Sequence, residues 1–239
     1  MELLPGVHRI ANAVSTAYLL VDEHAGLTLI DTGPTRFDRV ILRYLRQIGQ
    51  RPDAVKRIIL THRHFDHVGG AAALREATRA QVWAHPLDIP QIDGSERNRM
   101  PKGVMGAVMG AVVPMVFPLH PCRVDQQLAD GQSITMGDLG ELRVILTPGH
   151  TMGHCSLFLP SRRLFIAGDA LNNFSGTPAA SFDALNDDTL LANRTVVALA
   201  DTDADVLVFG HGNPILKDGQ AALHQAAAKA QAYLAAIAK

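Results

Sequence analysis

Apolar and polar residues follow two different periods along the first half of the chain. Two short apolar runs, at 19–21 and 27–30, flank a turn-prone polar segment and predict a β-hairpin. Between residues 37 and 48 the apolar positions recur three and four residues apart, which predicts an amphipathic helix that ends just before Gly49. The elements expected next are a buried strand, a helix and a short strand, at 56–61, 70–79 and 81–84.

The second half of the chain repeats this alternation of strands and helices. The expected strands are at 142–147, 155–159, 164–167 and 206–209, and the expected helices are at 188–200 and 220–238. Antiparallel strand pairs with helices interspersed in both halves favour two helix-covered sheets over one doubly wound sheet. We therefore predict an α/β fold (α+β by some schemes), an αββα four-layer sandwich of two mixed β-sheets flanked by helices, formed by a single domain over residues 1–239.

The composition of the chain argues against some classes of protein. The chain has 239 residues, of which 47% are hydrophobic, and this length is sufficient for one large core. Its 22 Lys and Arg against 23 Asp and Glu produce no field that would attract nucleic acid. Two cysteines form no disulfide framework, and the first residues contain no secretory signal pattern. We therefore expect a cytoplasmic protein that acts on a small molecule.

One segment, residues 103–119, contains no charged side chain. It is shorter than the roughly 20 residues that span a bilayer, and Pro114 and Pro118 interrupt it, so we expect no membrane span. The segment could be a lid that contacts an apolar acyl or aryl part of the substrate through Met105, Met109 and Met115. The favoured interpretation is a core helix or the contact of a homodimer, because the apolar residues of the segment also fall on helical spacing.

The chemistry of the chain concentrates where the strand at 56–61 ends. His62, His64, Asp66 and His67 are four potential metal ligands within six residues, and a turn by itself does not need three imidazoles. Gly69-Gly70 follows as a flexible corner before the next helix. Imidazole and carboxylate ligands suit Zn²⁺, Fe²⁺ or Mn²⁺, so these residues predict a metal site.

Three later segments add single ligand candidates, each directly after a predicted strand. They are His150 in Thr-Pro-Gly-His, Asp169 in Ala-Gly-Asp and His211 in Phe-Gly-His-Gly. Ligands at the ends of strands are typical of sites that loops build on a sheet. We interpret His154, which shortly follows His150, as a supporting or structural imidazole and not as a ligand.

Taken in order, these residues resemble the motifs of the metallo-β-lactamase superfamily, and Asp31-Thr-Gly resembles its upstream motif. The resemblance implies an αββα sandwich with two divalent metal ions, most simply Zn²⁺, with Mn²⁺ or Fe²⁺ as alternatives. It also implies the following roles: His62, His64 and His150 on one ion, Asp66, His67 and His211 on the other, Asp169 bridging the two, and Asp31 supporting a ligand.

The implied reaction is hydrolysis by a hydroxide that bridges the two ions, with Asp66 and Asp169 as the catalytic carboxylates. Metal binding lowers the pKa of water toward about 7, so this nucleophile is available at neutral pH. The expected target is the carbonyl of an ester, a thioester or a lactone.

Departures from the motifs of relatives favour one branch of the superfamily. Lactam hydrolases usually carry Cys or Ser where this chain has Asp169, which favours the glyoxalase II, lactonase and esterase group. Glyoxalase II continues into a helical domain after the last motif, whereas only the helix at 220–238 follows it here, which disfavours a glutathione thioester. Asn172 stands where one kind of lactonase has tyrosine, which weakens the match to that lactonase. Two alternatives stay open: a phosphodiesterase, or a persulfide dioxygenase-like enzyme with one iron on His62, His150 and Asp169.

Overall fold

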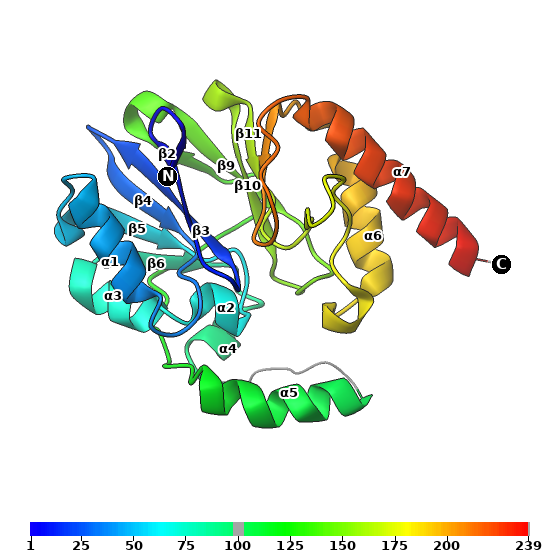
Figure 1. The fold of residues 1–239 in the computed structure, drawn as a ribbon, viewed down its shortest axis with the longest axis horizontal. Helices are drawn as coiled ribbons and strands as arrows, with labels where there is room; N and C mark the ends of the chain where they lie inside the picture. The colour runs from blue at the N-terminus through cyan, green and yellow to red at the C-terminus, as the bar shows by residue number, and fades with distance from the viewer. Residues whose placement is uncertain (98–102, 239) are drawn as a thin grey trace. The chain divides into compact units, whose positions relative to one another are not determined.

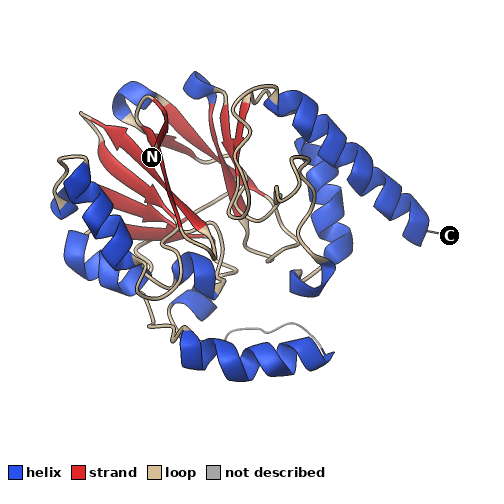
Figure 2. Ribbon diagram, in the orientation of Figure 1, coloured by secondary structure: helices blue, strands red, loops and turns tan. Residues whose placement is uncertain are grey.

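The computed structural model describes residues 1–97 and 103–238, which divide into two units, Met1–Leu128 and Ala129–Lys239. Each unit contains one β-sheet, drawn in red in Figure 2, and helices that cover it. Each unit has its own cluster of buried apolar residues, to which both its strands and its helices contribute.

The sheet of the N-terminal unit has the strand order β1-β2-β3-β4-β5-β6-β7. Its strands are β1 (Glu2–Leu4), β2 (Val7–Ala11), β3 (Thr16–Asp22), β4 (Gly26–Ile30), β5 (Val55–Ile59), β6 (Gln81–Ala84) and β7 (Gln126–Gln127). The pairs from β1 to β4 are antiparallel and those from β4 to β7 are parallel, so the sheet is mixed as predicted.

The predicted hairpin is formed by β3 and β4, and local chemistry explains its turn. A carboxylate oxygen of Asp22 accepts the backbone N–H groups of His24 and Ala25 at 2.9 and 2.6 Å. Gly26 then adopts a φ of +75°, which glycine reaches without steric cost. The hairpin is therefore closed by residues that lie within the turn itself.

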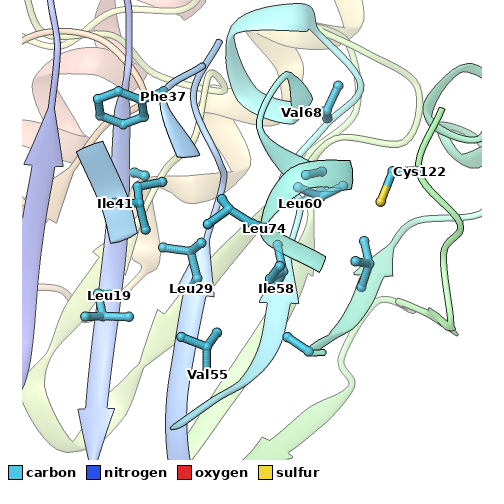
Figure 3. Packing of buried hydrophobic residues seen from close by; sticks show 14 of the residues in the cluster. Leu19, Leu29, Phe37, Ile41, Val55, Ile58, Leu60, Val68, Leu74 and Cys122 are labelled. Atoms are coloured by element: carbon cyan, nitrogen blue, oxygen red, sulfur yellow. The ribbon is translucent and has the colours of Figure 1, made fainter. Parts of the chain in front are cut away.

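Helices α1 (Asp38–Gln47) and α3 (Ala71–Thr78) cover one face of this sheet (Figure 1). Ile41 of α1 and Leu74 of α3 are buried against Leu19, Leu29 and Ile58 of the strands, as Figure 3 shows. Burial of side chains of this size contributes about 1.5–3 kcal/mol each. The apolar spacing that predicted α1 therefore includes its buried residues, Ile41 and Leu45, whereas Val40 is exposed.

The apolar segment forms α5 (Gly103–Val116), with Pro114 inside the helix. Val108, Val112, Met115 and Val116 are exposed, and Met115 leaves 85% of its surface accessible, so the interpretation as a core helix is wrong for these residues. Met105 and Met109 lie outside the described side chains. The roles as lid or dimer contact stay predictions. In the described part of the chain, no helix is long and apolar enough to cross a membrane.

The sheet of the C-terminal unit has the order β12-β11-β10-β9-β8. Its strands are β8 (Ser133–Thr135), β9 (Glu141–Leu146), β10 (Cys155–Leu159), β11 (Leu164–Ile166) and β12 (Val206–Val208). The pair β11 and β12 is parallel and the remaining pairs are antiparallel. This sheet is therefore also mixed.

Helices α6 (Thr189–Ala198) and α7 (Gly219–Ile237) pack against each other in this unit (Figure 1). Val196 of α6 and Leu223 of α7 join Phe165 and Leu207 of the strands in one buried cluster. The Ala-rich sequence of α7 lets the two helices approach closely, since its buried positions include Ala226.

Two mixed sheets with flanking helices confirm the predicted αββα fold class. The prediction of a single domain stays a prediction. Sequence reasoning missed the N-terminal strands β1 and β2, the short strands β7 and β8, and the one-turn helices α2 (Phe65–Val68) and α4 (Ile89–Ile92). Helices α2 and α4 have four residues each and β7 has two, which is too few for a periodic pattern.

Candidate metal centre

The cluster at 62–67 begins shortly after β5 ends and runs into α2. His62 and His67 are buried, and their ring centroids lie 4.1 Å apart. The His62 and His64 rings meet edge to face with centroids 4.8 Å apart. His62 offers a ligand atom within 4.8 Å of one on His64 and of one on His67, and Asp66 and His67 are paired in the same way. The N-terminal unit therefore gathers all four predicted ligands of this segment.

Gly69 and Gly70 lie where there is no room for a Cβ atom, although their backbone angles are ordinary. Gly69 has a φ of −60° and Gly70 a φ of −89°, values that any residue adopts. A Cβ atom on Gly69 would lie 2.3 Å from the backbone nitrogen of Thr35, and one on Gly70 would lie 2.6 Å from the carbonyl oxygen of Thr32. The expected flexible corner is therefore a point where two backbone segments touch.

Asp31 follows β4, the parallel neighbour of β5, and its carboxylate lies between Thr61 and His67. Oδ2 lies 2.8 Å from His67 Nδ1 and accepts the Thr61 hydroxyl at 2.8 Å, while Oδ1 accepts the Thr61 backbone N–H. A carboxylate at Nδ1 holds the ring proton there, which puts the lone pair of His67 on Nε2. This is the form of the ring that binds a metal ion.

Thr61 orients His62 in the same way. Because the Thr61 hydroxyl donates to Asp31, it accepts from His62 Nδ1, which lies 3.0 Å away. The proton of His62 is thus on Nδ1 and its lone pair on Nε2. One buried carboxylate therefore sets the tautomer of two histidines, one directly and one through a hydroxyl.

Arg63, between the two histidines, is almost fully buried and paired with Asp88. The Asp88 carboxylate accepts the Arg63 backbone N–H at 3.0 Å and its guanidinium at 3.3 Å. A buried charge is tolerated only when it is paired. This ion pair therefore secures the backbone between His62 and His64, and the sequence contained no signal that pointed to Asp88.

The C-terminal unit carries the remaining three predicted ligands. β9, β11 and β12 all run in the same direction, because β10 is antiparallel to β9 and β11, and β11 is parallel to β12. His150, Asp169 and His211 follow the ends of these three strands, so they emerge at the same edge of the sheet.

These three side chains converge on one carboxylate oxygen. Asp169 Oδ2 lies 3.5 Å from His150 Nε2 and 3.0 Å from His211 Nε2. Asp169 and His150 are buried, and His211 is partly exposed. Two imidazole nitrogens directed at one buried carboxylate form a donor set that suits a divalent cation.

His150 is oriented by Asn186, which precedes α6. His150 Nδ1 lies 3.1 Å from Asn186 Oδ1, and the Asn186 amide nitrogen donates to the backbone oxygen of Ser181 at 3.2 Å. The amide orientation thus makes Oδ1 the acceptor, and it puts the His150 lone pair on Nε2. Gly149 has a φ of +128°, and a Cβ there would lie 2.2 Å from the nitrogen of Ala192 in α6. The turn before His150 therefore contacts the helix directly.

His154 is fully buried and supports Asp169 through the backbone. Its Nε2 accepts the Asp169 backbone N–H at 2.9 Å, and its Nδ1 lies 2.7 Å from the Thr147 hydroxyl. Ser156 donates to the carbonyl oxygen of Ala167 and lies 3.0 Å from the same threonine hydroxyl. These partners require a neutral ring with its proton on Nδ1.

The donors fit a divalent metal ion by their chemistry. In His62, His67 and His150, an oxygen atom holds Nδ1 and leaves the lone pair on Nε2, the arrangement found behind metal-ligating histidines. Sequence reasoning missed the residues that supply this support, Thr61 and Asn186. Thr61 adjoins a ligand and could have been suspected, but Asn186 lies far from His150 in sequence.

Comparison with known proteins identifies the family of this chain. Residues 12–211 match the profile of the "Metallo-beta-lactamase superfamily". The chain is 30% identical over 234 residues to "Probable metallo-hydrolase YflN" of Bacillus subtilis (strain 168), covering 90% of this chain and 86% of that protein. It is 29% identical over 191 residues to a "Hydroxyacylglutathione hydrolase" of Cereibacter sphaeroides (strain ATCC 17029 / ATH 2.4.9), covering 76% of this chain but only 60% of that protein.

Solved structures show the same fold. A metallo-beta-lactamase family protein from Thermus thermophilus has a TM-score of 0.73 and 28% identity, covering 98% of this chain and 82% of its own. The metallo-beta-lactamase GOB-18 from Elizabethkingia meningoseptica has a TM-score of 0.71 and 20% identity, covering 96% and 88%. The resemblance that the motifs predicted is confirmed, and hydroxyacylglutathione hydrolases are among the relatives. This chain belongs to the metallo-beta-lactamase superfamily.

Proposed function

We propose that this protein is a metal-dependent hydrolase that cleaves the carbonyl–heteroatom bond of an ester, a thioester or a lactone. The observation that carries the proposal is the common support of His62, His67 and His150, each of which has an oxygen atom at Nδ1. Such support is of use where Nε2 binds a metal ion, because it sets both the tautomer and the angle of the ring.

The ligand assignment follows the family motifs. We propose two ions, most simply Zn²⁺, held by His62, His64 and His150 on one side, by Asp66, His67 and His211 on the other, and by Asp169 between them. In this assignment Asp31 supports His67, with which it shares a hydrogen bond of 2.8 Å.

When bound, such ions lower the pKa of water toward about 7 and stabilise the negative charge that develops on a carbonyl oxygen. The residues of this chain position the proposed ligands. Asp169 presents one carboxylate oxygen to His150 and His211 together. Asp31 orients the ring of His67, and Thr61, which donates to Asp31, orients the ring of His62. Asp66 and Asp169 are the carboxylates that we propose for proton transfer and charge balance.

The choice of substrate class rests on relatives. The chain resembles proteins named hydroxyacylglutathione hydrolase over part of their length. An acylglutathione is a thioester, so this name favours a thioester among the carbonyl substrates. Asp169 occupies the position that Cys or Ser takes in lactam hydrolases, which disfavours a β-lactam substrate. A cytoplasmic location and a small-molecule substrate stay part of the proposal.

The test combines metal analysis with a substrate panel. Purified protein would be loaded with Zn²⁺ or Mn²⁺ and assayed with S-lactoylglutathione, an acyl-homoserine lactone, a simple ester and a phosphodiester, each against a chelator-treated sample. We expect two ions per chain and metal-dependent cleavage of carbonyl substrates only. Asp169→Ala should abolish turnover.

Other outcomes would contradict the proposal in distinct ways. Cleavage of the phosphodiester alone would show that the protein is a phosphodiesterase and not a carbonyl hydrolase. A single Fe²⁺ per chain, with oxygen consumption on a persulfide, would show that the protein is an oxidoreductase and not a hydrolase. Full turnover in Asp169→Ala would show that this residue does not act as proposed.

A further inference from the structure

Two exposed phenyl rings lie beside the ligand His211. Phe174 leaves 61% of its surface accessible and Phe182 leaves 62%. The two rings stack with centroids 5.8 Å apart and an interplanar angle of 21°. The ring of Phe174 also lies 6.3 Å from the ring of His211 at an angle of 32°. The three rings therefore form a continuous aromatic surface within the C-terminal unit.

Backbone pairing holds Phe174 next to His211. The neighbouring Asn173 donates its N–H to the His211 carbonyl at 3.1 Å, and its own carbonyl accepts the Asn213 N–H at 2.9 Å. The Asn173 side chain adds a third hydrogen bond, to the Asn213 carbonyl at 2.8 Å. Gly212 permits this contact, because a Cβ there would lie 2.0 Å from the Asn173 carbonyl oxygen. The phenyl ring is thus positioned by the segment that carries the ligand.

Phe182 is tied to the segment of Asp169. The adjacent Ser181 donates its hydroxyl to the Asp169 carbonyl at 2.7 Å and accepts the Asn172 amide at 3.0 Å. Asn172 and Ala179 also exchange both backbone hydrogen bonds, at 2.9 and 3.1 Å. The exposed rings therefore stand on an ordered loop that both ligand segments anchor.

A single exposed phenylalanine needs no explanation, since isolated apolar side chains are common on protein surfaces. Phe174 and Phe182 are not isolated, because the two rings stack on each other and the hydrogen bonds of their loop hold them beside the proposed ligand His211. Apolar area held in water is unfavourable, and it becomes favourable when a ligand covers it. The position beside His211 implies that the covering ligand is one that reaches the metal centre.

We infer that Phe174 and Phe182 form a platform that binds an apolar group of the substrate, next to the bond that is cleaved. This inference rests on the proposed hydrolase function and names the class of substrate that the site selects. A carbonyl held at the centre beside His211 would place its acyl substituent against the Phe174 ring. The platform offers no charge and no hydrogen-bond donor, so it favours aryl or alkyl acyl groups over small or charged ones.

The experiment compares acyl groups on one leaving group, using whichever bond class the panel above identifies. Acetyl, hexanoyl and phenylacetyl substrates would be assayed with the metal-loaded wild type, Phe174→Ala, Phe182→Ala and Phe174→Leu. The control is Ile237→Ala, which removes a similarly exposed apolar side chain from the last residue of α7. Denaturant unfolding of each variant checks that the fold is retained.

We expect the wild type to prefer hexanoyl or phenylacetyl over acetyl by roughly tenfold or more in kcat/KM, as apolar pockets do for added carbon atoms. Phe174→Ala should bring this ratio to about one, Phe182→Ala should reduce it, and Ile237→Ala should leave it unchanged. Loss of only the phenylacetyl preference in Phe174→Leu would identify an aryl group as the ligand. Retention of both preferences would identify an alkyl chain.

A second readout separates this inference from the proposed function. Calorimetry would compare the binding of acetate, hexanoate and phenylacetate to the metal-loaded protein and its variants, without any turnover. Absence of hydrolysis together with tighter binding of the apolar acids, lost in Phe174→Ala, would overturn the proposed function and support the platform. Hydrolysis with equal ratios in wild type and Phe174→Ala, and equal binding of the three acids, would overturn the platform alone.

Discussion

The Nε2 atom of His154 accepts the backbone N–H of Asp169 at 2.9 Å, and both residues are buried. His154 thus supports the proposed bridging ligand through the backbone, and its other ring nitrogen lies 2.7 Å from the Thr147 hydroxyl. The interpretation of this residue from sequence, as a supporting or structural imidazole, now has a specific partner. A substitution of His154 should therefore change both the metal affinity and the unfolding free energy.

Replacing His154 separates its two hydrogen bonds. His154→Gln retains an acceptor that reaches the position of Nε2, whereas His154→Asn reaches only the position of Nδ1. We expect the Asn variant to lose about 1–3 kcal/mol of unfolding free energy, because the buried Asp169 N–H then has no acceptor. Its metal affinity should fall about 10–100-fold, and the Gln variant should recover most of both losses. Denaturant titration and chelator competition measure the two quantities. Equal behaviour of the two variants would contradict the role assigned to Nε2.

Asp31→Asn tests the tautomer of His67. The variant would direct an amide N–H at His67 Nδ1 in place of the carboxylate oxygen that now lies 2.8 Å away. The ring would then carry its proton on Nε2, the atom needed for the metal ion. We expect loss of one ion per chain or at least a roughly tenfold weaker second site, measured by metal analysis, together with a changed ¹⁵N shift of the ring.

The matched control for this change is Asp203→Asn, which alters an exposed carboxylate paired with Arg163 in the other unit. It should retain both ions. A full metal complement in Asp31→Asn would show that the carboxylate does not set the tautomer.

Gly149→Ala tests the contact between the His150 turn and α6. The φ of +128° costs a non-glycine residue about 1–3 kcal/mol, and the new Cβ would in addition lie 2.2 Å from the Ala192 nitrogen. Gly176→Ala is the control, because Gly176 has a φ of +85° but no atom within 4 Å of the added carbon. We expect a clearly larger loss of unfolding free energy at Gly149, with weaker metal binding. Similar losses at both positions would mean that the contact with α6 is unimportant.

Asp125 links α3 to β6 and should make stability depend on acid pH. Hydrogen bonds from the Arg75 guanidinium, and then from the Val82 backbone N–H, hold the pKa of Asp125 below its usual value. A depressed pKa contributes stability above the unfolded pKa of about 4, and this contribution is lost as pH falls through the lower folded value. We therefore expect Asp125→Asn to be destabilised at pH 7, with the difference from wild type shrinking below pH ~4.

The control for this dependence is Asp53→Asn, at a pair with Arg51 that is largely exposed. Solvent screens such a pair, so its removal should change the unfolding free energy little at any pH. A constant difference for Asp125→Asn between about pH 3 and pH 7 would contradict the ion pair as its source.

The sequence by itself identified the candidate ligands and most of the elements that precede them. The hairpin of β3 and β4, the helix α1 and the strand ends before His62, Asp169 and His211 all follow from periods and turn residues within a short window. The donors His62 to His67 are neighbours in sequence, so no tertiary information was needed to recognise them as a group.

Only the tertiary structure decided how those donors are held. Thr61 and Asp31 meet because β4 and β5 are parallel neighbours, and Asn186 reaches His150 across a loop that has no periodic pattern. The stacking of Phe174 on Phe182 depends in the same way on contacts between loops. Such partners are chosen by distance in space and by hydrogen-bond geometry. A pattern read along one chain records neither quantity.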